Sequence, residues 1–148
     1  FGKTLNMAMN ACDECGENKV FIAFTGVCVC EAGFATSANG SSCHECEPGR
    51  FTKDPGMTQC TACDTGTFAS ELKQTECFYC MEGTFTNETG RSECQMCNAV
   101  LLGSTTRLLG AKVSSDCSCP RGTYTEGRAC ARCREGMACP EIGMTAPR

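Results

Sequence analysis

Residues 63–80, CDTGTFASELKQTECFYC, contain the pattern that decides the fold, and residues 80–97, CMEGTFTNETGRSECQMC, repeat it. Each stretch has a Cys-x2-Gly-Thr-Phe start, a polar middle and a Cys-x2-Cys end. Glycine permits a tight turn after the cysteine, and the polar middle reverses the chain. We therefore expect each stretch to form a short two-stranded hairpin, with a core made of one aromatic ring over a disulfide or the neighbouring unit.

The pattern has a strict period of 17 residues across the centre of the chain. The first cysteines of four Cys-x2-Cys pairs are Cys43, Cys60, Cys77 and Cys94. Looser versions flank them, for about seven units in all. A short period with contacts only between neighbouring units implies a rod.

The composition agrees with a fold held by cross-links. The chain has 17 Cys among 148 residues, above the roughly 8–10% that marks a disulfide scaffold. Leu, Ile, Val and Phe together number only 21, too few to fill one large core. Cysteines at this density indicate an oxidising compartment: extracellular, secretory, or another lumen such as the thylakoid lumen.

We predict a small disulfide-rich fold, an elongated tandem array of short β-hairpin modules with little helix. Five segments are expected: an N-terminal extension (1–11), atypical first units (12–45), three 17-residue repeats (46–97), a long-loop unit (98–118) and C-terminal capping units (119–148).

The repeat register favours a bond from the second cysteine of one pair to the first cysteine of the next, because each loop keeps its motif while its length varies. The expected bridges are Cys15–Cys28, Cys30–Cys43, Cys46–Cys60, Cys63–Cys77, Cys80–Cys94, Cys97–Cys117, Cys119–Cys130 and Cys133–Cys139. A crossed pairing, such as Cys43–Cys60 with Cys46–Cys63, also fits the period.

Cys12 is the odd cysteine. In the register it closes the loop of a preceding unit, yet residues 1–11 contain no cysteine. Its partner lies in a longer precursor, in another chain, or at Cys28 if it displaces Cys15.

The sequence offers little for chemistry. Cys-x2-Cys-x13-Cys-x2-Cys is near zinc-ribbon spacing, but the sites would overlap and share cysteines, with only His44 to supplement them. We therefore expect no catalytic residue, metal or cofactor, and keep a zinc-binding protein as the last alternative. The net charge is −4 and no basic stripe is present, which argues against nucleic-acid binding.

Two apolar stretches depart from the repeat and are candidates for partner contact or for small local cores. They contribute Phe21, Ile22, Phe24, Leu101, Leu102, Leu108 and Leu109. The longest apolar run, residues 99–102, is far short of the ~18 residues that span a membrane. Two sequons, at Asn39 and Asn87, are candidate glycosylation sites that fit a secretory route.

The unit Cys-x2-Gly-Thr-Phe-x8-Cys-x2-Cys resembles the ephrin-receptor-like cysteine-rich repeat and is similar to the first loop of tumour-necrosis-factor-receptor modules. Residues 28–34, CVCEAGF, resemble the end of an EGF-like module. The ending at residues 133–140, CREGMACP, is similar to units that close such arrays in large surface proteins of unicellular eukaryotes. These resemblances imply a rod of small β-modules and no particular ligand.

Two function classes follow for this non-catalytic module, and in both its partners are other proteins. The first is an accessory or structural subunit on the oxidising face of a membrane assembly, to which the chain attaches without spanning the bilayer. A lumenal extrinsic subunit of a photosynthetic complex is one instance. The alternative is a fragment of a ligand-binding receptor ectodomain.

The pairing scheme predicts the thiol content. Eight bridges among 17 cysteines leave one thiol, so titration of the denatured, unreduced protein is expected to find no more than one. Several free thiols, or stoichiometric zinc by elemental analysis, would contradict the disulfide scheme.

Overall fold

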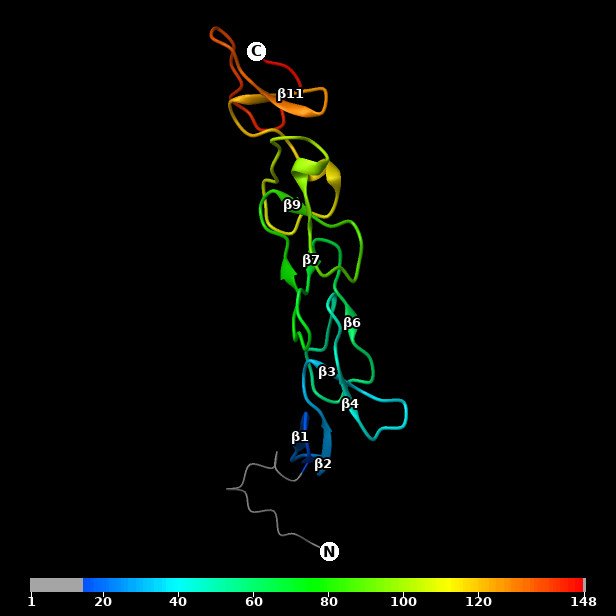
Figure 1. Cartoon of the computed structure of the whole chain (residues 1–148). Coiled ribbons are helices and arrows are strands. Elements are labelled where there is room, and N and C mark those ends of the chain that lie inside the picture. Colours follow the sequence, from blue (N-terminus) through cyan, green and yellow to red (C-terminus); the bar gives the residue numbers. More distant parts are fainter. Residues whose placement is uncertain (1–14, 148) are drawn as a thin grey trace, which may run out of the picture.

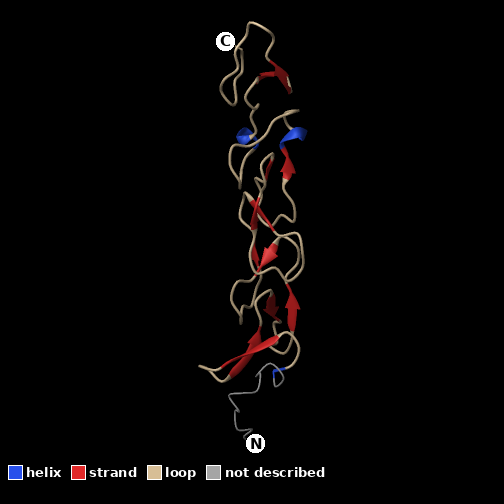
Figure 2. Cartoon of the chain, turned by 90° about the vertical axis from the view of Figure 1, so that its left-hand side faces the viewer, coloured by secondary structure: helices blue, strands red, loops and turns tan. Residues whose placement is uncertain are grey.

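The computed structural model describes residues 15–147. The extension 1–11 and Cys12 lie outside this part. Residues 15–147 form a long, narrow rod, with β1 (Lys19–Ile22) and β2 (Val27–Cys30) near one end and the C-terminal segment at the other (Figure 1). Short strands and loops follow one another along its axis, as the perpendicular view also shows (Figure 2). The predicted fold class, a tandem array of short antiparallel hairpins with almost no helix, is confirmed.

Six two-stranded antiparallel sheets lie in the described part of the chain. They pair β1 (Lys19–Ile22) with β2 (Val27–Cys30), β3 (Phe34–Thr36) with β4 (Cys43–Glu45), β5 (Arg50–Phe51) with β6 (Thr61–Ala62), β7 (Thr67–Phe68) with β8 (Phe78–Tyr79), β9 (Thr84–Phe85) with β10 (Gln95–Met96), and β11 (Thr123–Glu126) with β12 (Ala129–Arg132). Two 3₁₀ turns, η1 (Cys97–Ala99) and η2 (Ser114–Asp116), lie in the long-loop unit.

All sixteen cysteines of the described part are in disulfides, in loops that follow one another along the chain. The bonds are Cys15–Cys28, Cys30–Cys43, Cys46–Cys60, Cys63–Cys77, Cys80–Cys94, Cys97–Cys117, Cys119–Cys130 and Cys133–Cys139. These are the pairs that the repeat register favours, and the crossed pairing is not present. Below, a unit is one such loop, named by its two cysteines.

A turn just after the first cysteine starts each hairpin. In unit 46–60, the amide of Arg50 donates to the carbonyl of Glu47, and Gly49 has a φ of 88°. Pro48 and Gly49 occupy the two central positions, the residue types that a type II turn prefers. We call Gly33, Gly49, Gly66, Gly83 and Gly122, the third residues after these cysteines, the turn glycines.

Units 46–60, 63–77, 80–94 and 97–117 each contain a tip that reaches back to the unit before it, and the segment just after unit 133–139 forms a fifth. The tip residues are Gly56, Lys73, Gly90, Gly110 and Gly143, all with positive φ. The tip amide donates to the carbonyl of the cysteine that starts the preceding unit. The acceptors, in the same order, are Cys30, Cys46, Cys63, Cys80 and Cys119, at 2.7–3.0 Å.

Two further backbone bonds join successive units. The amide of Thr52 donates to Gln74, and the amide of Gly49 donates to Ala69, at 3.2 and 2.7 Å. The units that contain Gly33 and Gly66 are joined to the units after them by the same pair of bonds. One bond comes from the turn glycine and the other from the residue three positions later. The units are thus joined by main-chain groups, whose pairing depends little on side-chain identity.

The buried axis of the rod is made of small side chains. Six of the eight cysteines that start the units, Cys63 and Cys80 among them, are fully buried. So are Thr52, Ala69 and Thr86, each three residues after a turn glycine. The expected ring core is confirmed at Phe34 and Phe85, which are buried, and is wrong for units 46–60 and 63–77. There the phenylalanine is partly exposed and the next residue faces the following unit.

Contacts also extend beyond neighbouring units, which corrects the expectation of neighbour-only contacts. A Cβ built on Gly49 would overlap the carbonyl of Gly90, which belongs to the tip two units further along. Gly33 meets Lys73 and Gly66 meets Gly110 in the same way. Glycine is required here both for its positive φ and for this close approach.

This close approach can be separated from the φ requirement by two alanine substitutions. Gly49→Ala and Gly122→Ala share nearly the same φ, 88° and 83°, and each is expected to cost about 1–2 kcal/mol for that reason. Gly122 has open space around it, whereas Gly49→Ala adds an overlap worth about 1–3 kcal/mol. Guanidinium unfolding with the disulfides intact measures the difference, and equal losses would contradict the close approach.

Candidate protein-contact surface

The long-loop unit 97–117 departs from the other units by insertions on both sides of its turn motif. Gly103-Ser104-Thr105-Thr106 corresponds to the Gly-Thr-Phe-Thr stretch of unit 80–94, with a threonine in place of the ring. Three extra residues precede Gly103. The buried Thr106 takes the role of the buried threonine in other units, and its hydroxyl accepts a bond of 3.1 Å from the amide of Gly83.

The tip of this unit is fixed while its leucines point outward. Gly110 donates to Cys80 at 2.8 Å, and Ala111 accepts from Thr86 at 3.1 Å. Leu108 and Leu109, just before the tip glycine, are 77% and 56% exposed. A fixed backbone thus presents two adjacent, large apolar side chains to solvent, and contiguous apolar surface of this kind is a candidate for protein contact.

A groove of about 620 Å³ lies beside these leucines. Loop 106–118 forms most of its lining, and Ile142 and Gly143 complete it. The guanidinium of Arg107 donates to the carbonyl of Ile142 at 3.1 Å and so links the long-loop unit to the C-terminal segment. The groove therefore forms only where two parts of the chain, 35 residues apart, meet.

Two of the three charged side chains that line the groove are basic. Arg107 and Lys112 line it. Asp116 also lines it, but its carboxylate accepts from the amides of Lys112 and Val113 at 2.9 and 3.2 Å. Residues 98–148 contain seven Lys or Arg and four Asp or Glu, opposite in sign to the acidic remainder. This end of the rod is therefore the basic one.

Tyr79 extends the apolar surface and was not predicted. It is 66% exposed, and its ring lies 2.8 Å from the position that a Cβ on Gly110 would occupy. The repeat register explains why Tyr79 lies there. The residue directly before a unit-starting cysteine lies beside the tip of the next unit. Val29 contacts Gly56, Ala62 contacts Gly90, and Glu45 forms an ion pair of 3.6 Å with Lys73. We call Tyr79, Leu108, Leu109 and Ile142 the contact surface.

The structure does not bring all the predicted contact residues together. Leu101 is partly buried, and Leu102 joins unit 97–117 to Arg128 and Cys130 through backbone bonds. Phe21, Ile22 and Phe24 lie at the far end of the rod, in or beside β1 (Figure 1). There Phe21 and Ile22 are half-buried and Phe24 is 98% exposed.

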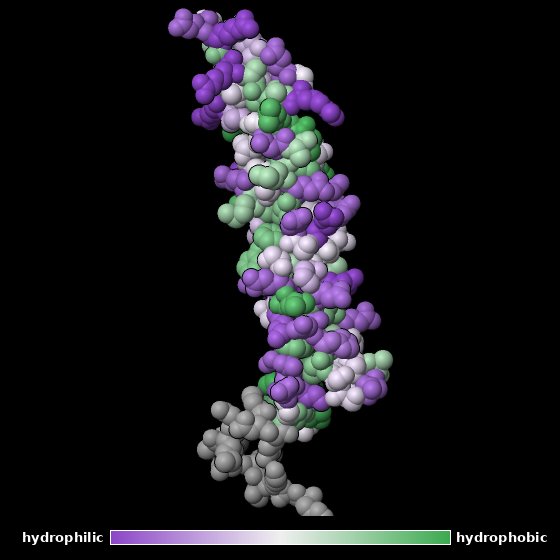
Figure 3. All heavy atoms as spheres, in the orientation of Figure 1, coloured by the Kyte–Doolittle hydropathy of each residue, from purple (hydrophilic) through white to green (hydrophobic). Residues whose placement is uncertain are grey.

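Apolar side chains elsewhere are scattered. Figure 3 shows hydrophobic residues as small clusters between hydrophilic ones on the face in view. Within residues 15–147, no group of three or more His, Cys, Asp or Glu is arranged to hold a metal ion. In the same part no helix is long and apolar enough to cross a bilayer. His44, beside Cys43 in β4, is exposed and pairs across the sheet with Ala35.

These features define a class: a rod of cysteine-rich repeats closed by disulfides. Residues 66–117 match the model of a family described as tyrosine-protein kinase ephrin type A/B receptor-like. The predicted resemblance to ephrin-receptor-like cysteine-rich repeats is therefore confirmed over these residues. The matched cysteine-rich domain is a structural or ligand-binding module. The kinase that the family's description names is a separate domain. No curated protein matches the chain.

Proposed function

We propose that this chain is an extracellular, non-catalytic rod that binds a protein partner through the contact surface. The observation that carries the proposal is the pair of exposed leucines, Leu108 and Leu109, on a tip that backbone bonds fix beside a groove. The partner we expect has an apolar segment flanked by acidic residues, because Arg107 and Lys112 border the groove.

The segment boundaries acquire a function in this proposal. The three regular repeats (46–97) act as a spacer, and the long-loop unit (98–118) carries the contacts. The capping units (119–148) complete the groove through Ile142. The rod separates the contact surface from residues 15–45 at its other end (Figure 1).

The disulfides and the family match support an oxidising, extracellular type of compartment. They agree with a receptor ectodomain and with an accessory subunit of a membrane assembly. No observation favours a photosynthetic complex or the thylakoid lumen, so the proposal does not include them. Zinc binding is not supported either, because disulfide-bonded cysteines provide no thiolate ligand.

The leucines can be tested against the protein that co-purifies with the chain from its native source. Leu108→Ser is expected to weaken binding at least tenfold, because burying a leucine contributes about 1.5–3 kcal/mol. Titration calorimetry measures the affinity.

Leu72→Ser is the matched control, since Leu72 is also exposed, at 49%, and precedes the tip of unit 63–77. Equal affinities for the Leu108 variant and the unsubstituted chain would show that the partner binds elsewhere. If the Leu72 variant loses the same amount of affinity, the partner binds exposed apolar side chains non-specifically along the rod.

A further inference from the structure

We propose that Asn39 and Asn87 each carry an N-linked glycan. Both asparagines are in sequons, Asn39-Gly40-Ser41 and Asn87-Glu88-Thr89, and both are exposed. They lie in loops of disulfide-closed units, 30–43 and 80–94. A chain that forms these disulfides in a secretory compartment meets the enzymes that recognise sequons there.

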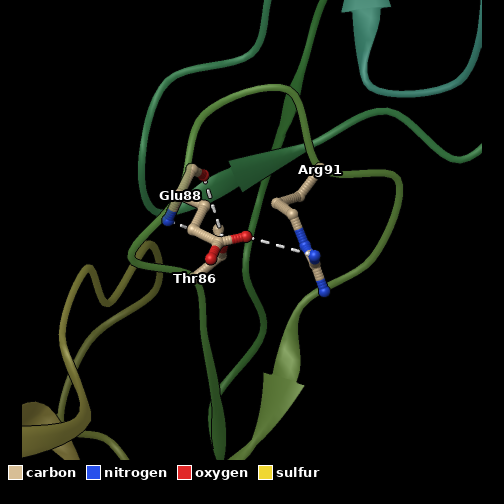
Figure 4. A network of polar contacts seen from close by, with 3 residues as sticks. All are labelled: Thr86, Glu88 and Arg91. Atoms are coloured by element: carbon tan, nitrogen blue, oxygen red, sulfur yellow. Dashed lines mark hydrogen bonds and ion pairs between the residues drawn. The ribbon is translucent and has the colours of Figure 1, made fainter.

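The loop around Asn87 is held in a way that leaves this side chain free. The Thr86 hydroxyl accepts from the amide of Glu88 at 3.4 Å and donates to its carbonyl at 3.2 Å. The guanidinium of Arg91 pairs with the Glu88 carboxylate at 3.2 Å (Figure 4). Within the described residues, Asn87 itself makes no hydrogen bond, and its amide is open to solvent.

The loop around Asn39 uses only the oxygen of its side chain. The Oδ1 atom accepts from the Ser37 hydroxyl at 2.6 Å, and from the amide and hydroxyl of Ser41 at 3.2 and 2.8 Å. Glycosylation takes place at Nδ2, which makes none of these bonds. The folded turn is therefore compatible with a sugar on Asn39.

The modification needs a lipid-linked oligosaccharide pyrophosphate as donor. A bond forms between Nδ2 of the asparagine and the first carbon of the sugar, while the bond from that carbon to the pyrophosphate breaks. The lipid pyrophosphate leaves, Nδ2 loses one proton, and nothing is oxidised or reduced. A bulky, hydrophilic group then covers each of the two loops.

The placement has a consequence for the rod. Residues 98–148 contain no Asn-x-Ser/Thr sequon, so the long-loop unit and the capping units remain free of N-linked sugar. Both glycans lie on the N-terminal side of this region. The glycan on Asn39 is in unit 30–43, apart from the contact surface. Asn87 is closer to that surface, because the amide of the preceding Thr86 donates to Ala111 at the groove. Both glycans can be tested without a partner.

The test uses the full 148-residue chain secreted from eukaryotic cells. Intact mass is measured before and after peptide N-glycosidase treatment in heavy-oxygen water. The expected result is loss of two glycans, with heavy-labelled aspartate at positions 39 and 87 in the peptide map. A secreted, disulfide-bonded chain with an unmodified mass would overturn the proposal, and label at one position only would overturn it for the other asparagine.

Matched substitutions assign each glycan to its sequon. Thr89→Val is expected to abolish the label at Asn87, and Thr89→Ser to retain it. At the other loop, Ser41→Ala is expected to abolish the label at Asn39 and Ser41→Thr to retain it. Each of these two variants is expected to keep one glycan, on the other asparagine. A second glycan that persists in Thr89→Val or in Ser41→Ala shows that sugar is attached elsewhere and contradicts the assignment.

Discussion

The rod depends on the backbone bond between a tip amide and the carbonyl of the cysteine that starts the preceding unit. At Gly90 this bond to Cys63 is 2.7 Å long. A single such bond contributes about 0.5–1.5 kcal/mol, and the disulfide closing a loop of this length contributes about 3 kcal/mol. The disulfides shape each unit, and the backbone bonds set how one unit lies on the next. Apolar burial has a minor part, because the axis is lined by cysteine, threonine and alanine.

The same bond positions the contact surface. The amide of Gly110 is held at Cys80, and Tyr79 immediately precedes that cysteine, so the ring of Tyr79 lies against the tip that carries Leu108 and Leu109. The insertions in unit 97–117 lengthen the loop without breaking the tip contact. One long loop therefore changes the surface of the rod and leaves its axis intact.

Much of this architecture is predictable from the sequence because cysteine spacing records it directly. The 17-residue period leads to the hairpins, the rod and the family resemblance. Burial was harder to predict. In units 46–60 and 63–77 the phenylalanine is the residue expected to be buried, yet the backbone turns the following residue, Thr52 or Ala69, toward the next unit. Contacts such as Gly49 with Gly90 link units that are not neighbours, and a period alone carries no information about them.

The contact surface was only partly predictable. Leu108 and Leu109 were identifiable because they interrupt a polar pattern, but Ile142 reaches the groove only through the fold, 33 residues after Leu109. Tyr79 stands directly before a unit-starting cysteine. That position lies beside the tip of the next unit, but the sequence alone does not show where the tips lie. Phe24 is equally apolar, but it belongs to unit 15–28, which lies at the opposite end of the rod.

The chain of disulfide loops also determines how the rod behaves under tension. A pulling force passes from Cys60 through Cys63 to the bond with Cys77, and the rest of the loop carries none of it. The three residues from Cys60 to Cys63 span at most ~10 Å, and the Cα atoms of Cys63 and Cys77 are 5.8 Å apart. One repeat can thus lengthen to only ~16 Å, whereas 17 unbridged residues would reach nearly ~60 Å. The disulfides therefore set an upper limit on the length of each regular repeat, even when its hydrogen bonds are broken.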